Sequence, residues 1–102
     1  MYQIRKKRME QVLQIGVDLE TAIQSLNDDT LVAIPTETVY GLGGNALSEL
    51  AVSRIYEAKN RPNYDPLIIH VDSVQKITKY CREFPLLARE LAEIFMPGPL
   101  TL

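Results

Sequence analysis

The sequence predicts an α/β protein in which helices flank a small sheet. Segments with one apolar face at helical spacing alternate along the chain with short apolar runs rich in β-branched residues. The chain has 102 residues, of which 46% are hydrophobic and 24% charged, as in globular proteins rather than disordered or fibrous ones. A chain of this length forms at most one compact unit.

Charge, cysteine content and hydropathy exclude several classes of protein. A formal net charge of −2 does not by itself favour binding to nucleic acid or to an anionic membrane. Cys81 is the only cysteine, which excludes an intrachain disulfide and leaves no zinc-binding pattern. No apolar run approaches the roughly 20 residues that cross a bilayer, and no apolar signal segment follows the basic start. We therefore expect a cytoplasmic protein that does not bind membranes.

Residues 1–17 are predicted to be an N-terminal extension, followed by one domain at 18–102. Four consecutive basic residues, 5–8, lie in this extension and form either a nucleic-acid-binding arm or a solvated terminal surface. No repeat, low-complexity tract or linker follows, so we place no boundary inside 18–102.

The first elements of the domain are a helix and a strand. Asp18 is a credible N-cap, and the apolar residues after it recur at helical spacing until the polar residues at 27–29. Residues 30–34 then form a short β-branched run closed by Pro35, which predicts a buried strand.

A glycine-rich segment and a second helix come next. Gly41, Gly43 and Gly44 fit neither a P-loop nor a dinucleotide-binding fingerprint, so they indicate either a tight turn or the close approach of a ligand. Ser48 is the predicted N-cap of a helix that stops before Arg61, because a residue that precedes proline avoids helical backbone. The apolar face of this helix comprises Ala51, Val52, Ile55 and Tyr56.

The second half of the chain predicts a loop over 60–66 and another buried strand over 67–71. Asp72 or Ser73 then caps a short helix through Ile77. Pro85 begins a last helix that Met96 to Pro99 ends, and a third strand begins at 100–102. The apolar stripe of the last helix comprises Leu87, Leu91, Ile94 and Phe95.

So few strands do not make a complete sheet. Sheets usually have about four to six strands, and this chain predicts only two and the start of a third. We therefore expect the chain to be the first part of a larger domain or to pair with another chain.

Five polar residues are candidates for chemistry. The hydroxyls of Thr36 and Thr38 either face one ligand or cap local backbone groups. Lys59 and Arg61 would project to one side of an extended backbone, where they suit a phosphate or carboxylate; the alternative is a solvated surface pair. His70 is either a core histidine with one backbone bond or a residue that orients a ligand or handles a proton.

Four motifs in order resemble the YrdC-like family, the threonylcarbamoyl-AMP synthases. They lie at 35–43, 59–62, 65–71 and 97–101, and the resemblance covers about residues 18–102. It implies a twisted mixed α/β sheet with flanking helices around a concave basic cavity. There, ATP, L-threonine and bicarbonate are converted to L-threonylcarbamoyladenylate and pyrophosphate. The product supplies the threonylcarbamoyladenosine modification of tRNA through separate threonylcarbamoyl-transfer proteins.

The resemblance also implies which residues bind the nucleotide and act in catalysis. The family's K-x-R element falls on Lys59 and Arg61, which would hold phosphate and the threonine carboxylate or carbamate, and Asn63 is a further candidate for nucleotide contact. Preorganised cations stabilise the negative charge that develops in carbamate formation and adenylate transfer. Mg²⁺ is expected to accompany ATP by bridging its phosphate oxygens, although the sequence identifies no ligand for it.

For L-threonine, the resemblance implies a pocket formed by Thr36, Tyr40, Arg61 and His70. One departure lies beside this set, because Asn60 stands where a glycine is common in the family. The family's later S-x-N element, which helps to bind the nucleotide, is expected beyond residue 102.

Two alternatives remain open at this point. A YrdC-like paralogue with a carbamoyl-transfer role would share the fold and the basic cavity but use another acyl acceptor. A non-catalytic module would instead bind double-stranded RNA through phosphates and shape.

Overall fold

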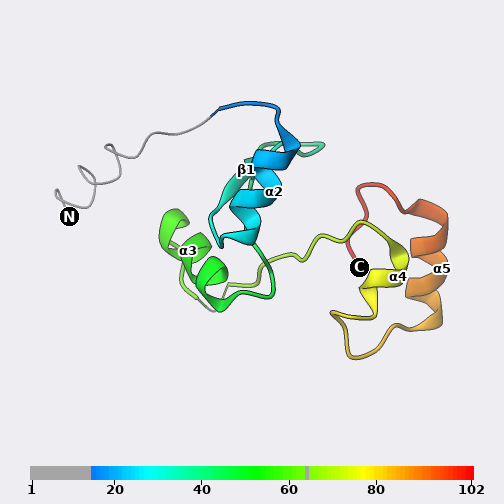
Figure 1. The fold of residues 1–102 in the computed structure, drawn as a ribbon. Helices are drawn as coiled ribbons and strands as arrows, with labels where there is room; N and C mark the ends of the chain where they lie inside the picture. The colour runs from blue at the N-terminus through cyan, green and yellow to red at the C-terminus, as the bar shows by residue number, and fades with distance from the viewer. Residues whose placement is uncertain (1–14, 64) are drawn as a thin grey trace, which may run out of the picture.

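The computed structural model describes residues 15–63 and 65–102, so most of the predicted extension, including the basic residues 5–8, lies outside the described residues. Figure 1 shows two units joined by an extended connection. We call residues 15–63 the amino-terminal unit, residues 65–71 the connecting segment and residues 72–102 the carboxy-terminal unit. The elements are α2 (Leu19–Asn27), β1 (Val32–Ile34), β2 (Gly41–Gly43), α3 (Glu49–Lys59), α4 (Val74–Ile77) and α5 (Leu86–Phe95).

Helix α2 begins where the sequence predicts. One carboxylate oxygen of Asp18 accepts a hydrogen bond from the backbone N–H of Glu20 at 3.0 Å, and the other accepts one from the hydroxyl of Thr21 at 2.6 Å. The cap satisfies a backbone donor that has no partner inside the helix. The predicted first helix and its N-cap are therefore confirmed.

The predicted first strand is present as β1, but it is not buried as predicted. It pairs with β2 in an antiparallel register that sets Val32 opposite Gly43 and Ile34 opposite Gly41. Ala33 and Ile34, whose side chains point to opposite faces of the strand, are both exposed, so neither face is fully covered by the described residues. The prediction of a buried strand was therefore wrong in this respect.

Strand β2 was not predicted, because glycine has low strand propensity and the segment had been interpreted as a turn or a ligand loop. The backbone of β1 provides the partner that makes it a strand. None of the glycines has a positive φ, so the cluster does not serve a left-handed turn. At Gly44 a Cβ atom would lie 2.9 Å from Leu31 Cδ2 and 3.3 Å from Ile55 Cδ1. A glycine here lets the chain after β2 approach α3 closely.

Helix α3 carries the buried residues of the amino-terminal unit. The hydroxyl of Ser48 accepts a hydrogen bond from the backbone N–H of Ala51 at 3.2 Å, which confirms the predicted cap. Ala51 and Ile55 are buried, and Val52 and Tyr56 on the same face are half-buried. This helix therefore buries the apolar face that its sequence predicts.

The predicted strand at 67–71 is not formed. A strand needs hydrogen bonds to a neighbour, and the described residues provide no partner for this segment. Ile68 and Ile69 are exposed rather than buried. Residues 100–102 likewise form no strand, for the same reason.

The two helices of the carboxy-terminal unit occur where the sequence predicts them, with N-caps at Ser73 and Pro85. The apolar stripe of α5 is not buried, however. Leu87 and Ile94 are exposed, and Ala92 is the buried residue of this helix. Helix α5 contacts α4, but the described residues contain nothing that covers the larger side chains.

Overall dimensions agree with this loose packing. The radius of gyration is 16.1 Å, compared with about 13 Å for a compact domain of 100 residues. Cys81 is a free thiol, as predicted. Within the described part of the chain, no helix combines the length and the apolar character needed to cross a bilayer.

Candidate functional site

The end of α3 places Lys59 and Arg61, the two cations of the predicted site. Lys59 is the last residue of the helix, and Asn60 adopts a left-handed conformation with φ of 51°. Asparagine tolerates this conformation better than most residues, so Asn60 suits a position where the resemblance leads us to expect glycine. The extended backbone assumed for Lys59 and Arg61 is therefore wrong, because a helix end and a left-handed residue separate the two side chains.

Both cationic side chains are accessible. Lys59 and Arg61 are exposed, and neither forms a side-chain hydrogen bond or ion pair with residues 15–63 or 65–102. Two uncommitted cations at a helix end can bind an anion without first breaking an internal ion pair. Their role in catalysis and nucleotide binding stays a prediction.

Residues 60–63 and Asp65, which we call the arginine loop, are fixed at both ends by Tyr56. The backbone N–H of Arg61 donates to the Tyr56 carbonyl oxygen at 3.0 Å. The Tyr56 hydroxyl donates to the carbonyl oxygen of Asp65. Inside the loop, the N–H of Asp65 donates to the Pro62 carbonyl at 3.1 Å. One residue of α3 therefore holds both ends of the segment that carries Arg61 and Asn63.

Thr36 lies in the connection between β1 and β2, and its hydroxyl has local partners. The hydroxyl donates to the carbonyl oxygen of Val39 and accepts from the N–H of Thr38 at 3.3 Å. The hydroxyl oxygens of Thr36 and Thr38 are 3.4 Å apart. The local capping alternative is therefore realised, while threonine binding by Thr36 stays a prediction.

Tyr40 and His70, the other predicted threonine contacts, are exposed on different segments. Tyr40 directly precedes β2, and His70 lies in the connecting segment with Nδ1 3.3 Å from the carbonyl oxygen of Ile68. The core-histidine alternative is wrong, because the unpaired segment leaves the ring exposed. Substrate contact by these two residues stays a prediction.

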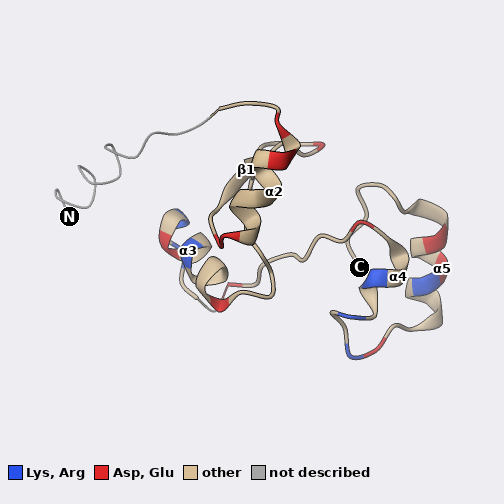
Figure 2. Cartoon of the chain, viewed as in Figure 1, with Lys and Arg blue, Asp and Glu red and all other residues tan. Residues whose placement is uncertain are grey.

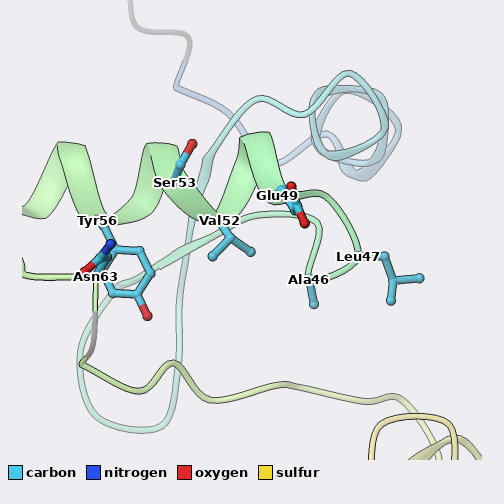
Figure 3. A pocket seen from close by; sticks show the side chains of 7 residues that line it. All are labelled: Ala46, Leu47, Glu49, Val52, Ser53, Tyr56 and Asn63. Atoms are coloured by element: carbon cyan, nitrogen blue, oxygen red, sulfur yellow. The ribbon is translucent and has the colours of Figure 1, made fainter.

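A hollow of about 560 Å³ lies along α3 beside the arginine loop. The helical spacing of residues 49, 52, 53 and 56 places them on one side of α3. In Figure 3, Tyr56 and Asn63 lie at one end of the hollow, and Ala46 and Leu47 at the other. Its lining residues are Ala46, Leu47, Glu49, Val52, Ser53, Tyr56 and Asn63.

Of the predicted site residues, the structure brings only Asn63 into this lining, as far as the described residues go. Thr36, Tyr40, Lys59, Arg61 and His70 are not part of it. Glu49 and Ser53 were not predicted site residues, and Tyr56 was predicted only as part of an apolar face. The helical spacing of Glu49, Ser53 and Tyr56 was the sequence signal that could have placed them together.

The charges are mixed along the elements. Figure 2 shows basic and acidic positions together on α3 and again on α5. The hollow is lined by one acid, Glu49, and by no lysine or arginine among the described residues. The basic character of the cavity therefore stays a prediction. The described part of the chain contains no group of three or more His, Cys, Asp or Glu residues able to hold a metal ion.

Comparisons with known proteins identify relatives for most of the chain. The Sua5/YciO/YrdC family model, which carries the description telomere recombination, matches residues 24–102. A threonylcarbamoyl-AMP synthase of Pyrococcus abyssi is 56% identical over 77 residues, and one of Bacillus subtilis is 47% identical over 77 residues. A putative threonylcarbamoyl-AMP synthase of Methanocaldococcus jannaschii is 32% identical over all 102 residues.

The relatives are much longer than this chain. The matches cover 76% of the chain but only 23% of the Pyrococcus abyssi protein and 22% of the Bacillus subtilis protein. A solved structure of a Pyrococcus abyssi Sua5 variant aligns with 76% of the chain and 24% of its own, with a TM-score of 0.74 and 51% identity. The similarity confirms the predicted α/β fold class, and the chain spans only part of that fold. The family model begins at residue 24, and the predicted boundary at residue 18 stays a prediction.

Proposed function

Because the chain belongs to the Sua5/YciO/YrdC family, we propose that it supplies part of a threonylcarbamoyl-AMP synthase. The observation that carries this proposal is the 56% identity, over 77 residues, to the Pyrococcus abyssi protein of that name. The proposed substrates are ATP, L-threonine and bicarbonate, and the proposed products are L-threonylcarbamoyladenylate and pyrophosphate. The adenylate would pass to threonylcarbamoyl-transfer proteins that modify tRNA.

The reaction concentrates negative charge at the step that we assign to Lys59 and Arg61. The threonine amine and bicarbonate form a carbamate with loss of water, and a carbamate oxygen attacks the α-phosphorus of ATP. The bond between the α-phosphorus and the bridging oxygen breaks, and pyrophosphate leaves. Two uncommitted cations beside this centre would hold the anions and stabilise the charge that develops. We assign phosphate contact to Lys59 and Asn63, and carboxylate or carbamate contact to Arg61.

We assign contact with L-threonine to Thr36, Tyr40 and His70 in addition to Arg61. The two threonine hydroxyls lie side by side after β1, where Thr36 would need only to exchange a local partner for the ligand. Magnesium enters the proposal as part of the MgATP substrate, held by the phosphate oxygens.

A chimera tests the function in a polypeptide of complete length. The matched segment of the Pyrococcus abyssi protein is replaced by the 77 matched residues of this chain, and pyrophosphate release is measured with ATP and bicarbonate, with and without L-threonine. We expect threonine-dependent release. Equal release without threonine would indicate a paralogue with another acceptor. No turnover together with salt-sensitive binding of double-stranded RNA would indicate the binding module.

In the same chimera, Lys59→Ala and Arg61→Ala are each expected to lower turnover at least about 100-fold, the usual effect of removing a group that stabilises transition-state charge. Lys79→Ala, an exposed lysine after α4, is the matched control and should retain turnover. Thermal melting should change little in all three, because exposed cations contribute little to the core. Retained turnover in Lys59→Ala and Arg61→Ala would contradict the catalytic role assigned to these cations. A large fall in their melting temperatures would contradict it as well.

A further inference from the structure

We infer that Tyr56 is a positioning residue that holds the arginine loop, and with it the proposed nucleotide contact Asn63, in the geometry needed to bind ATP. The inference rests on the proposed function, because it concerns the anion-binding residues of that site. Tyr56 itself is not assigned a contact with the reacting atoms. Its effect is on the placement of Arg61 and Asn63.

The hydrogen bonds of Tyr56 carry the inference. Its backbone carbonyl accepts from the N–H of Arg61, and its side-chain hydroxyl donates to the carbonyl of Asp65. The first bond belongs to the helix end and needs no particular side chain. The second depends on the phenol, because no other side chain of the described residues bonds to the Asp65 carbonyl.

The ring is well placed for this role. Tyr56 is half-buried and directly follows Ile55, a buried core residue whose side chain lies close to Gly44. A ring held on a packed helix forms a rigid support for a loop. By contrast, Arg61 and Asn63 are exposed, and their side chains have no protein partner among the described residues. The position of these two residues therefore depends on the backbone of the loop.

The expected cost of removing the hydroxyl follows from the usual strength of a hydrogen bond. The usual net free energy of one hydrogen bond changes an equilibrium constant, here that between the bound and released positions of the loop, about fivefold. If the loop samples other positions without this bond, ATP binds to a smaller population of competent molecules, and its apparent affinity falls by the same factor.

The test compares Tyr56→Phe with Tyr80→Phe in the chimera. Both variants lose only a phenolic hydroxyl, and Tyr80 lies outside the site, after α4. We expect Tyr56→Phe to raise the KM for ATP about fivefold with less than a twofold change in kcat, and Tyr80→Phe to change neither. Amide hydrogen exchange at Asp65, whose N–H is bonded to the Pro62 carbonyl inside the loop, should become faster in Tyr56→Phe alone.

The split between KM and kcat separates positioning from a general structural role. Partial unfolding lowers the amount of active enzyme, so the apparent kcat would fall while the KM stayed the same, and that result would overturn the inference. Unchanged KM, kcat and exchange in Tyr56→Phe would also overturn it while leaving the proposed function intact. Absence of turnover in the unmodified chimera would overturn the proposed function first, and the inference with it.

Discussion

The amino-terminal and carboxy-terminal units differ in how far apart in the sequence their contacting residues lie. In the amino-terminal unit, the side chain of Arg54 donates to the carbonyl oxygen of Asp29 at 2.7 Å, a bond between residues 25 positions apart. The pairing of β1 with β2 and the packing of α3 near Gly44 also join separate elements. In the carboxy-terminal unit, every hydrogen bond of the described residues joins positions no more than four apart, as in the pair Lys76 and Asp72.

The two units owe their order to different kinds of contact. Contacts between distant residues hold α3 against the segments that flank β1 and β2, and Ala51 and Ile55 are buried there. Local hydrogen bonds form the helices of the carboxy-terminal unit, and the contact between α4 and α5 leaves Leu87 and Ile94 exposed. We therefore expect substitutions in the amino-terminal unit to affect stability more than matched substitutions in the carboxy-terminal unit.

The largest expected effect comes from the same substitution in both units. Ile55 is 7% exposed and Ile94 is 72% exposed. Ile55→Ala should lower the free energy of unfolding by about 2 kcal/mol or more, because it leaves a cavity in the core. Ile94→Ala should change it by at most about 0.5 kcal/mol, because the side chain is already in water. Urea denaturation of the two variants measures both values.

Equal destabilisation by Ile55→Ala and Ile94→Ala would show that the units do not differ as described. A larger effect at Ile94 would mean that α5 is covered in solution, for example by a second molecule. Repeating the denaturation at several protein concentrations distinguishes this case, because stability that depends on association rises with concentration.

A smaller effect is expected for two arginines with different partners. Arg54→Ala removes the bond to Asp29 and should lower the free energy of unfolding by about 1 kcal/mol. Arg89→Ala removes a cation–π contact with Phe84, whose ring centroid is 5.2 Å from the guanidinium carbon, and should cost about half as much. Chemical denaturation monitored by circular dichroism compares the two variants. A larger loss of unfolding free energy for Arg89→Ala would contradict the conclusion that contacts between distant residues stabilise the amino-terminal unit more.

The smallest effects are those of pH on two helix starts. The hydroxyl of Thr21, followed by the N–H of Glu20, holds the pKa of Asp18 below its ordinary value. The ammonium of Lys76 lowers the pKa of Asp72, and this carboxylate in turn raises the pKa of Lys76. A depressed carboxyl pKa stabilises the folded state above the unfolded pKa, so both contributions are lost as the pH falls below about 4.

The two helix starts should differ in alkali. The raised pKa of Lys76 contributes stability below its unfolded pKa, and this contribution is lost as the pH rises above about 10.4. The start of α4 should therefore respond to both acid and alkali, and the start of α2 only to acid. NMR titration of the amides measures this, with Thr21→Val as the control that raises the pKa of Asp18 toward its ordinary value. An unchanged pKa of Asp18 in Thr21→Val would contradict the assigned cause.

Site residues could be proposed from the sequence, but their geometry could not. The spacing of Lys59 and Arg61 alone left a solvated surface pair open, and the family resemblance assigned them to the site; the structure places them at the end of α3. The left-handed residue between them changes their relative direction, which an assumed extended backbone could not reproduce. The role inferred for Tyr56 was hidden, because its partner is a backbone carbonyl and leaves no mark in the side-chain pattern.

The sequence by itself determined the helices of this protein, together with caps such as Asp18 and Ser48. A helix satisfies its backbone groups within four residues, so its limits depend on nearby side chains. Whether Gly41–Gly43 and residues 67–71 form strands depends on pairing in the folded chain, and the structure shows that the first segment does and the second does not. Strand hydrogen bonds require a partner from elsewhere in the chain, and no local pattern records whether that partner is present.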